Sequence, residues 1–480
     1  CSGTYFRRVE DEVNRYMVPA TLSRILMQSS LVKQLAKRAE AGKPLRVGVI
    51  GAGKFATMFL SQARRLPGLH VLGVADLSQE LARLALSRAH WPEEQYAADS
   101  FTAALKFGST CICDNAESLL QVDGLDIVVE STGDPGAGID HALKAFQEGV
   151  HVVMVNVEAD AVAGPLLARR AREAGVVYSL AYGDQPALIC ELVDWARSTG
   201  FDVVCAGKGT SYLPIYHSST PETVWDYYGL NTKQAADGGL NTKMFNSFLD
   251  GTKSAIEMAA VANATGLKPQ PEGLSFPPCG VNDLPEVCRP RASGGQLSHS
   301  GTVEVVSSLE RDGSPVFLDL RWGVYVTLEA PNEYVMRCFS EYGMVTDSTG
   351  RYTALYRPAH LIGLELSISV LKVGLRGEAT GSPCYFRGDV AATAKRSLSS
   401  GEVLDGEGGY CVYGTLMSSE QSVSTGTLPI GLSNNLVLLN DIPEGQTLLW
   451  SDVKIDSRNS ILRFRKEMER VFGQEKEGRG

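Results

Sequence analysis

The stretch Leu45-Arg-Val-Gly-Val-Ile-Gly51-Ala-Gly53-Lys-Phe-Ala56 decides the fold of this chain. Its first half is typical of a short buried strand, which continues through a Gly-x-Gly-x-x-Ala turn into a helix. Gly51 permits the tight turn, Gly53 lets a pyrophosphate approach the backbone, and Ala56 lets the helix pack closely on the strand. The free N–H groups that begin such a helix attract phosphate. The turn therefore predicts a dinucleotide site, with contacts from Gly51, Ala52, Gly53, Lys54 and Phe55.

A second apolar strand, Val71-Leu-Gly-Val-Ala-Asp76, ends in an acidic residue. A carboxylate at this place in a dinucleotide-binding fold accepts hydrogen bonds from a ribose hydroxyl group. The same carboxylate repels the additional 2′-phosphate of NADP. Asp76 therefore favours NAD over NADP as the cofactor.

Strand and helix patterns alternate beyond this point. Further apolar runs at 126–130, 152–155 and 176–180 are separated by helical patterns around 141–148 and 165–174. The alternation is typical of an α/β fold with a doubly wound parallel sheet of the Rossmann type. Its ligand crevice lies beyond the carboxyl ends of the strands. The residues after those ends are further cofactor-binding candidates: Ser131, Thr132, Gly133, Asn156 and Glu158.

The pattern changes from about residue 190. The expected elements are a helix over 188–198, a strand over 202–206 that ends in a Gly207-Lys208-Gly209 loop, a long helix over about 241–264, a proline-rich loop over 268–290, and strands at 302–308, 315–322 and 325–328. The alternating apolar residues of these last strands suit an antiparallel sheet. A helical segment after His360 is expected to return to the first domain.

Two segments near the end of the chain repeat each other. Arg396-Ser-Leu-Ser-Ser-Gly-Glu-Val-Leu404 matches Asn440-Asp-Ile-Pro-Glu-Gly-Gln-Thr-Leu448, with glycine at the same place in both. Each reads as a strand end, a glycine turn and another strand, which predicts a small β-rich module. The expected division is a helical segment (1–44, with helices over 11–41), a cofactor domain (45–190), a catalytic domain (191–385), and the β-rich module with a tail (386–480).

Bulk composition is that of an ordinary enzyme. The chain has 480 residues, which exceeds a single hydrophobic core, and a net charge of −10, which argues against nucleic-acid binding. No apolar run reaches the roughly 18 residues of a membrane span. Ten cysteines are scattered without the spacing of a zinc or redox site. Residues 5–43 lack the apolar core of a secretory signal, so a cytoplasmic enzyme is expected.

Long stretches of the chain carry a family resemblance. They are 35–44, Val155-Asn-Val-Glu-Ala-Asp160, Cys205-Ala-Gly-Lys-Gly209, 250–266 and Tyr356-Arg-Pro-Ala-His-Leu361. Over residues 31–454 the chain resembles the deoxyxylulose-phosphate reductoisomerase-like family, which includes apionate oxidoisomerases and is distantly related to homoserine dehydrogenase. The terminal module resembles a SAF domain, a β-clip. The resemblance implies a Rossmann domain, an α+β catalytic and oligomerisation domain, and a homo-oligomer.

The resemblance implies oxidation or reduction coupled to carbon-skeleton rearrangement. Because Asp76 disfavours NADP, we expect the oxidative branch, in which NAD oxidises a small branched sugar acid. The alternatives are an NADPH-dependent reductoisomerase acting on a sugar phosphate, a homoserine dehydrogenase, or a cofactor-bound sensory or structural protein. The last is disfavoured by charges on an otherwise apolar helix.

Two strand-end sites depart from the family pattern. Asn156 and Glu158 resemble a segment beside the nicotinamide, but Val157 replaces its lysine, and both residues also suit a helix cap. Asp184 lies where the reductoisomerases place a metal-binding Asp-x-Glu pair, of which Tyr182 replaces one member. A divalent metal is therefore weakly predicted, and Asp184 is equally able to cap the next helix.

The remaining candidates for catalysis or substrate binding have charged or hydrogen-bonding side chains. Lys208 is expected to bind an anionic group or polarise a carbonyl, unless it is a solvated loop residue. Lys253 and Glu257 stand four residues apart on one helix face, which predicts an ion pair in which Lys253, with a lowered pKa, is the general acid/base. A surface ion pair has the same spacing. The substrate-binding candidates are Asn263, Arg357 and His360, the last two of which also suit structural roles.

Overall fold

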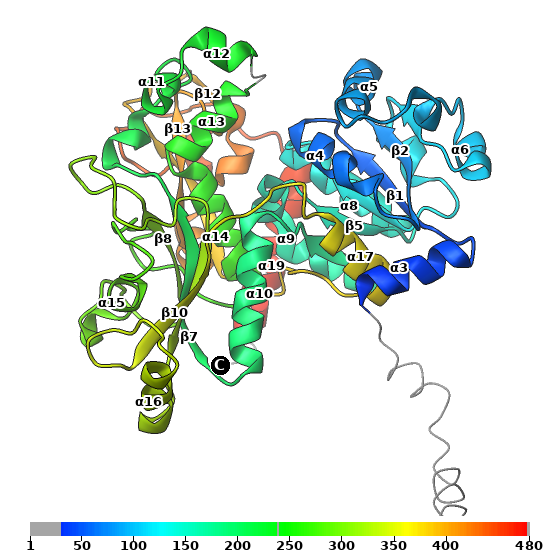
Figure 1. Cartoon of the computed structure of the whole chain (residues 1–480). Coiled ribbons are helices and arrows are strands. Elements are labelled where there is room, and N and C mark those ends of the chain that lie inside the picture. Colours follow the sequence, from blue (N-terminus) through cyan, green and yellow to red (C-terminus); the bar gives the residue numbers. More distant parts are fainter. Residues whose placement is uncertain (1–29, 238–239, 478–480) are drawn as a thin grey trace, which may run out of the picture.

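A six-stranded parallel sheet forms the first lobe of the computed structural model (Figure 1), which describes residues 30–237 and 240–477. Its order is β3-β2-β1-β4-β5-β6. The strands are β1 (Leu45–Ile50), β2 (Leu69–Ala75), β3 (Cys111–Cys113), β4 (Ile127–Glu130), β5 (His151–Met154) and β6 (Tyr178–Leu180). This doubly wound sheet confirms the predicted fold class. The three residues of β3 were missed because so short a strand shows no alternation.

Helices cover both faces of this sheet. They are α4 (Lys54–Ala63), α5 (Gln79–Arg88), α6 (Phe101–Phe107), α7 (Ala116–Leu120), α8 (Pro135–Gln147) and α9 (Val157–Glu173), joined by α3 (Leu31–Glu40) and the later α17 (Ser367–Arg376). Helix α17 contacts α3, α4, β4, β5 and β6, which confirms the expected return to the first domain. Of the helices expected over 11–41, residues 11–29 lie outside the described part.

A four-stranded sheet forms the second lobe, in the order β10-β9-β7-β8. Its strands are β7 (Asp202–Thr210), β8 (Thr302–Ser307), β9 (Val324–Glu329) and β10 (Tyr352–Arg357). The predicted antiparallel sheet was wrong in one respect, because β8 pairs with β7 in parallel. The strand predicted at 315–322 is also absent; this segment consists of turns with isolated bridges at Pro315 and Asp319.

Strand β7 continues past its expected end, so that Lys208 lies within the sheet and not in a loop. The neighbouring glycines permit this. A Cβ atom on Gly207 would stand 1.7 Å from the backbone oxygen of Glu304, and one on Gly209 would stand 2.0 Å from that of Leu320. The Gly-Lys-Gly sequence therefore marks close backbone contact on both sides of a strand residue.

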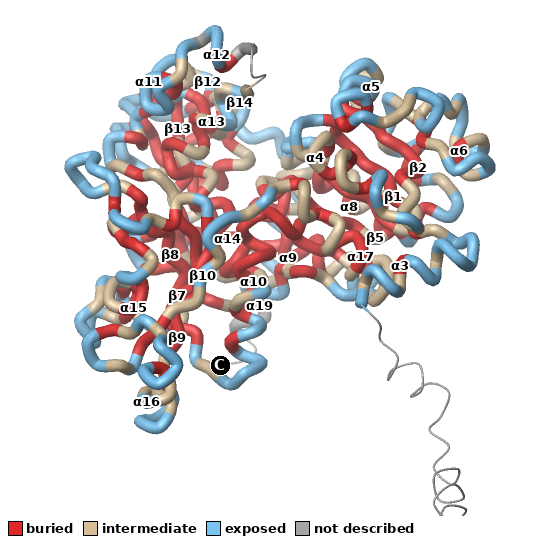
Figure 2. The backbone as a smooth tube through the Cα atoms, in the orientation of Figure 1, coloured by how far each residue is buried: buried red, intermediate tan, exposed pale blue. Residues whose placement is uncertain are grey.

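The long helix expected over 241–264 is divided into α13 (Thr242–Leu249) and α14 (Thr252–Thr265). Gly251, with φ of +86°, makes the break. Helix α14 is buried almost throughout (Figure 2). It contacts α9, α10 (Gln185–Ser198), β8 and the later strands β11 (Gly388–Ala394) and β13 (Val412–Ser418). It is the centre on which both lobes and the C-terminal strands pack.

The C-terminal strands are β11 (Gly388–Ala394), β12 (Val403–Asp405), β13 (Val412–Ser418) and β14 (Asn434–Val437). The two repeated segments pair with each other, since the backbones of Leu398 and Ile442 exchange hydrogen bonds of 2.8 and 2.9 Å. Apolar residues of β11 and β13 belong to the same core as α14. The C-terminal module therefore has no core separate from the catalytic lobe.

The other helices are short, with α11 at Val224–Tyr228, α12 at Thr232–Asp237, α15 at Leu284–Val287, α16 at Glu333–Glu341, and α18 at Ser419–Thr425. The chain ends in the longer α19 (Ser460–Glu477), which packs on α9. None of the described helices is both long and apolar enough to cross a membrane.

Arg465 fixes α19 to the rest of the molecule. Its side chain is fully buried, pairs with the buried Asp389 of β11, and donates a hydrogen bond of 3.0 Å to the backbone oxygen of Val162 in α9. Glu469 completes its contacts at 2.9 Å. One side chain thereby joins three elements that are distant in sequence.

We expect Arg465→Met to lower the free energy of unfolding by about 3–5 kcal/mol, because the Asp389 carboxylate would remain buried without its cation. Arg463→Met, at an exposed position of the same helix, should change it by less than about 0.5 kcal/mol. Denaturant unfolding followed by circular dichroism measures both. Equal effects of the two substitutions would contradict the anchoring role of Arg465.

Candidate functional site

The Gly-x-Gly-x-x-Ala turn lies between β1 and α4 as predicted. Gly51 has φ of +89°, and a Cβ atom there would stand 2.8 Å from the backbone of Ser131. The Ser131 hydroxyl group donates to the backbone oxygens of Ile50 and Gly51 at 2.9 Å. Nothing lies within 4 Å of a Cβ atom placed on Gly53. The turn is therefore closely packed against the sheet at Gly51 and open at Gly53, where a ligand would approach.

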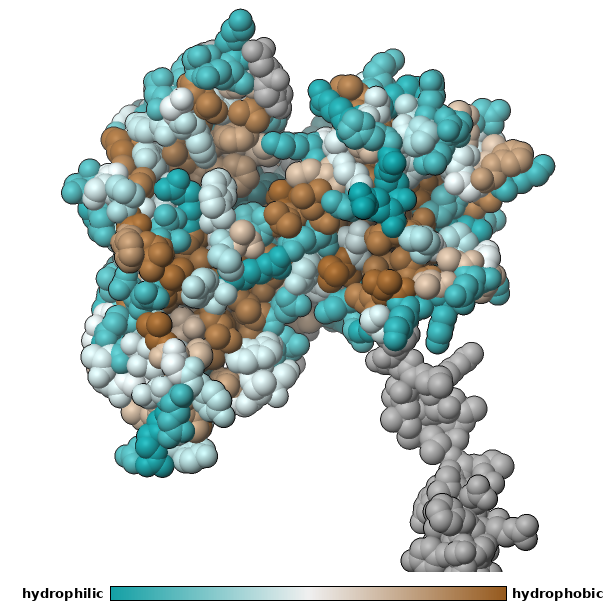
Figure 3. All heavy atoms as spheres, viewed as in Figure 1, coloured by the Kyte–Doolittle hydropathy of each residue, from teal (hydrophilic) through white to brown (hydrophobic). Residues whose placement is uncertain are grey.

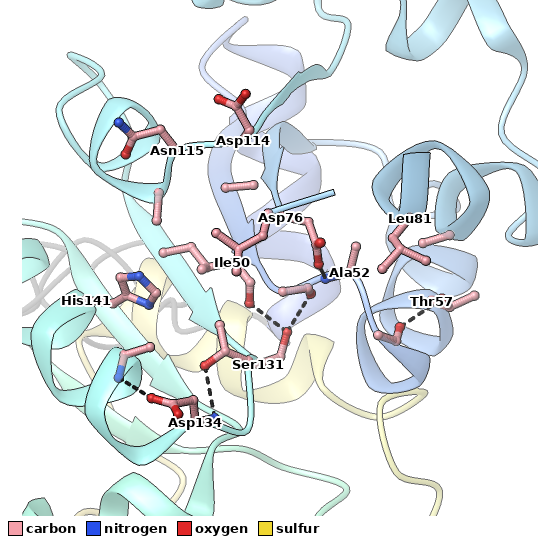
Figure 4. A pocket seen from close by; sticks show the side chains of 18 of the residues that line it. Ile50, Ala52, Thr57, Asp76, Leu81, Asp114, Asn115, Ser131, Asp134 and His141 are labelled. Carbon is pink, nitrogen blue, oxygen red and sulfur yellow. Dashed lines mark hydrogen bonds between the residues drawn. The ribbon is translucent and has the colours of Figure 1, made fainter. Parts of the chain in front are cut away.

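A cavity of about 1350 Å³ opens beside this turn at the carboxyl ends of β1, β2, β3 and β4 (Figure 4). Of the predicted cofactor-binding residues, the structure brings together here Gly51, Ala52, Gly53, Lys54, Asp76, Ser131 and Thr132. The Asp76 carboxylate accepts hydrogen bonds from the backbone N–H groups of Ala52 (2.7 Å) and Ser78 (2.9 Å). These two hydrogen bonds fix the Asp76 carboxylate beside the glycine turn.

The cavity has the features that a dinucleotide requires. Helix α4 begins at Gly53 without a side-chain cap, so its first N–H groups remain available to an anion. Asp76 presents a carboxylate at the end of β2, where ribose hydroxyl groups are bound in such folds. These residues fit the adenosine and pyrophosphate parts of a nicotinamide dinucleotide.

The sequence analysis missed His141 as a residue of this cavity. It lies on α8 and faces the buried Glu130, whose Oε1 atom is 3.2 Å from His141 Nδ1 and accepts a hydrogen bond of 2.6 Å from Thr132. The available signal was a histidine in the helix that follows the Ser131-Thr132-Gly133 strand end. The pair fixes the Thr132 hydroxyl group at the cavity wall.

Four predicted cofactor residues do not line this cavity: Phe55, Gly133, Asn156 and Glu158. Phe55 packs against the apolar core of the first lobe. Asn156 caps α9 by accepting from the N–H group of Ala159, and its amide donates to the backbone oxygen of Asp134 at 2.7 Å. Asn156 therefore has the helix-capping role that the sequence offered as an alternative to cofactor binding. The side chain of Glu158 turns toward the second lobe.

Two ion pairs meet where the lobes join. Lys253 of α14 pairs with Glu158 of α9, and Lys208 of β7 pairs with Glu257 of α14. The predicted pair of Lys253 with Glu257 was wrong, because α9 and β7 each bring a partner of opposite charge against the helix. The Lys208 pair is almost fully enclosed, with 5% and 3% of the side chains exposed, whereas the Lys253 pair remains about 15% exposed.

The electrostatic environment of Lys253 opposes the lowered pKa that the sequence suggested. Burial acts to lower the pKa of Lys253, but the carboxylates of Glu158, Glu407, Asp184 and Glu257 outweigh burial and raise it. Lys253 is therefore an ammonium group at neutral pH. It can donate hydrogen bonds to a substrate oxygen and stabilise negative charge on it, but it cannot accept a proton.

Asp184 lies beyond the end of β6, close to this group. It begins α10 and accepts a hydrogen bond of 2.9 Å from the N–H group of Gln185. Burial, and after it the Glu257 carboxylate, raise the pKa of Asp184 to about 6, against the opposing charges of Lys253 and His360. A carboxylate with this pKa is suited to accept a proton near neutral pH.

Metal binding at Asp184 gains no support from the neighbouring side chains. Across residues 30–237 and 240–477, no three His, Cys, Asp or Glu side chains are grouped as metal ligands. The hydroxyl group of Tyr182 donates to Glu191, and the cation that acts on Asp184 from α14 is the Lys253 ammonium group.

The three predicted substrate-binding residues differ in their contacts. Asn263 was wrongly predicted, because it is fully buried and its amide binds the backbone of Arg387 and Gly388 at 2.7–3.1 Å. Arg357 pairs with Glu365, so its charge is already matched. His360 Nδ1 lies 2.7 Å from the backbone oxygen of Trp322 and so carries the proton. Its Nε2 atom has no hydrogen-bond partner among the described residues and is available to a ligand.

We expect a double-mutant cycle to separate the two possible partners of Glu257. Lys208→Met should lower the free energy of unfolding by about 3–5 kcal/mol, because it leaves a buried carboxylate without a cation. Adding Glu257→Met should recover most of that loss. The same cycle with Lys253→Met should give a smaller coupling energy. Unfolding free energies measure the couplings, and the reverse order would restore the original Lys253–Glu257 assignment.

Two family profiles match adjoining parts of the chain. The profile described as "Homoserine dehydrogenase, NAD binding domain" matches residues 47–180, and that described as "Oxidoreductase DRL, catalytic domain" matches residues 183–366. The first covers the six-stranded sheet, and the second begins one residue before Asp184 and includes the sheet of the second lobe. The chain thus carries the two domains of an NAD(P)-dependent oxidoreductase. No curated protein sequence matches it.

Solved structures resemble the chain only distantly. Myo-inositol dehydrogenase from Lactobacillus casei, in complex with NAD(H) and myo-inositol, is 19% identical over 38% of this chain and 50% of that one, with a TM-score of 0.27. The WlbA dehydrogenase from Bordetella pertussis, in complex with NADH and UDP-GlcNAcA, is 16% identical over 38% and 50%, with a TM-score of 0.25. A probable dehydrogenase from Thermotoga maritima is 12% identical over 70% and 90%, with a TM-score of 0.33. The chain spans half the length of the first two, and similarity at this level does not bear on the reaction.

Proposed function

We propose that this chain is an NAD-dependent oxidoreductase that oxidises a hydroxyl group of a small, branched sugar acid and rearranges its carbon skeleton. One observation carries the proposal: a lysine ammonium group and a carboxyl group of raised pKa, Lys253 and Asp184, lie within electrostatic range of each other beyond the carboxyl end of the cofactor-binding sheet. The match of residues 183–366 to an oxidoreductase catalytic domain supports it.

The cofactor supplies the acceptor for a hydride ion when it is bound. The open side of Gly53 and the start of α4 would receive its pyrophosphate, and Asp76 its ribose hydroxyl groups. Glu158 follows β5 and Asp184 follows β6 on the edge of the sheet where Gly51 follows β1. The face seen in Figure 3 is hollowed between the upper parts of the two lobes. A substrate between Asp184 and Lys253 is therefore on the side of the sheet where the cofactor binds.

The two groups divide the proton chemistry between them. Hydride can leave carbon only as the hydroxyl proton departs, and ionised Asp184 accepts that proton. The Lys253 ammonium group donates a hydrogen bond to the same oxygen and stabilises the charge that develops on it. Lys208 neutralises Glu257 from β7, and the Nε2 atom of His360 is proposed to accept a hydrogen bond from a hydroxyl group of the substrate.

The same arrangement serves the rearrangement of the resulting hydroxy-ketone. Once the proton of the oxidation step has passed from Asp184 to solvent, the Asp184 carboxylate takes the proton of the hydroxyl group next to the new carbonyl, as a carbon–carbon bond migrates from that carbon to the carbonyl carbon. The alkoxide becomes the new carbonyl, and the former carbonyl oxygen gains the electron pair beside Lys253. A proton returned to that oxygen completes the balance.

We expect the protein to bind NAD at least about tenfold more tightly than NADP, a difference of about 1.4 kcal/mol. Asp76→Asn should narrow this ratio by removing the repulsion of the 2′-phosphate, while its amide oxygen still accepts from Ala52. Asp76→Ala should weaken NAD binding further, because the hydrogen bonds from Ala52 in the turn and from Ser78 are both lost. Calorimetric titration of the three proteins with both cofactors gives the ratios. A preference for NADP in the unaltered protein would exclude the oxidative branch.

We expect Asp184→Asn to lower turnover by about 10²–10⁴-fold, because the amide still caps α10 but cannot accept a proton. Turnover of the unaltered enzyme should fall as the pH falls through about 6, where Asp184 becomes protonated, and this limb should disappear in the variant. Asp194→Asn, at an exposed position of the same helix, serves as the matched control. Lys253→Met should lower turnover as strongly, with NAD affinity retained.

A substrate panel tests the reaction itself. Branched and linear sugar acids and sugar phosphates are incubated with NAD or NADPH, followed by cofactor absorbance at 340 nm and by carbon-13 NMR of the products. Oxidation of a branched sugar acid with a moved carbon–carbon bond is the expected result. Oxidation without rearrangement would reduce the proposal to a dehydrogenase, and turnover of sugar phosphates with NADPH alone would overturn it.

A further inference from the structure

A glycine-rich loop of the C-terminal module reaches the junction of the lobes. This loop, residues 406–411, follows β12 and precedes β13. The Asp405 carboxylate closes it by accepting from the N–H groups of Tyr410 (2.6 Å) and Cys411 (3.1 Å). The loop therefore has a defined conformation of its own, with Glu407 at its tip.

Helix α13 holds the loop from one side. The Asn246 amide donates to the backbone oxygen of Gly408 at 3.0 Å, and the Lys243 ammonium group donates to that of Asp405 at 2.9 Å. A Cβ atom on Gly408 would stand 1.9 Å from the backbone oxygen of Lys243. The loop and the helix are thus in backbone contact, which only glycine permits at this position.

Lys395 of the module holds the loop from the other side. Its ammonium group donates to the backbone oxygens of Gly409 (2.9 Å) and Ser219 (2.8 Å) and pairs with Asp250 at 2.7 Å. Asp250 in turn accepts from the N–H group of Thr252 at 2.9 Å, at the start of α14. One buried cation therefore ties the loop to the helix that carries Lys253.

The result of these contacts is a fixed carboxyl group near Lys253. The Ser247 hydroxyl group of α13 donates to Glu407. Burial, followed by the charges of Glu158 and Asp250, raises the pKa of Glu407 to about 7, whereas Lys253 and the Ser247 hydrogen bond act in the opposite direction. Glu407 belongs to neither of the two ion pairs, and neither the cofactor cavity nor the reaction above uses it.

We infer that Glu407 is a positioning residue of the active centre: fixed by Ser247 in a loop that is tied to the start of α14, its carboxyl group orients the Lys253 ammonium group that Glu158 binds. The inference rests on the proposed role of Lys253. The paired Glu158 fixes the ammonium group from the first lobe, and the charge of Glu407 acts on it from the module. The module thereby completes the active centre, which explains why a loop so far along the chain is anchored to α13 by a lysine, an asparagine and a glycine.

The direct test measures Lys253 without any substrate. Competitive acetylation with isotope-labelled acetic anhydride at pH 8.5, read by peptide mass spectrometry, reports the fraction of Lys253 in the amine form. Glu407→Gln should speed acetylation of Lys253 about tenfold, corresponding to a fall of about one pKa unit. Ser247→Ala should act in the same direction more weakly. Glu444→Gln, at an exposed position of the module, is the control, and unchanged acetylation of Lys253 in Glu407→Gln would overturn the inference.

The second readout is the pH profile of kcat/KM. Glu407→Gln should lower kcat/KM about 10–100-fold at pH 8.5, because the oxygen-binding group is no longer held in place. Near pH 6, where Glu407 of the unaltered enzyme is mostly protonated, the two proteins should converge. A constant ratio across this range would show a merely structural role and overturn the inference. If the unaltered enzyme turned over no substrate while Glu407→Gln still changed acetylation, the proposed function would fail and the action of Glu407 on Lys253 would stand.

Discussion

The structure depends on the balance of charge around α14. This helix crosses the apolar centre of the molecule, yet it carries Lys253 and Glu257. Charges can remain in such a place only when opposite charges reach them. β7 brings Lys208 and α9 brings Glu158, so the requirement for partners fixes which elements lie against which flank of the helix. The arrangement that stabilises the charges also places an ammonium group and a carboxyl group of raised pKa at the end of the cofactor-binding sheet.

The division between the two ion pairs follows from their enclosure. The Lys208–Glu257 pair is closed on all sides, whereas the Lys253–Glu158 pair keeps some access to solvent. The two charges of an enclosed ion pair stay bound to each other. In a partly exposed pair, the lysine can bind a substrate oxygen in place of its carboxylate partner. The second lobe thus holds the enclosed pair, while the junction of the lobes holds the lysine that is proposed to bind the substrate oxygen.

Local pattern predicted the parts of the site that local chemistry determines. The Gly51–Gly53 turn and Asp76 lie where their spacing indicated, because a strand, a turn and a helix fix one another over a few residues. Partners across the fold were not predictable in this way. A spacing of four residues permits a Lys253–Glu257 pair, but nothing in the helix reveals the nearer Lys208 on a distant strand. Glu407 had no local signal at all, since Asp405-Gly-Glu-Gly-Gly409 reads as a solvated loop.

Two elements of the first lobe come from much later in the chain. Helix α17 packs on α3 and β5, and α19 packs on α9 through Arg465. During synthesis the cofactor domain therefore emerges long before the helices α17 and α19 that cover it. Nearly three hundred further residues are made before α19 can pack on the apolar side of α9. Contacts between such distant segments slow folding and leave early intermediates with exposed apolar surface. A chain built in this order is expected to rely on chaperones while it is on the ribosome, even though its finished core is continuous.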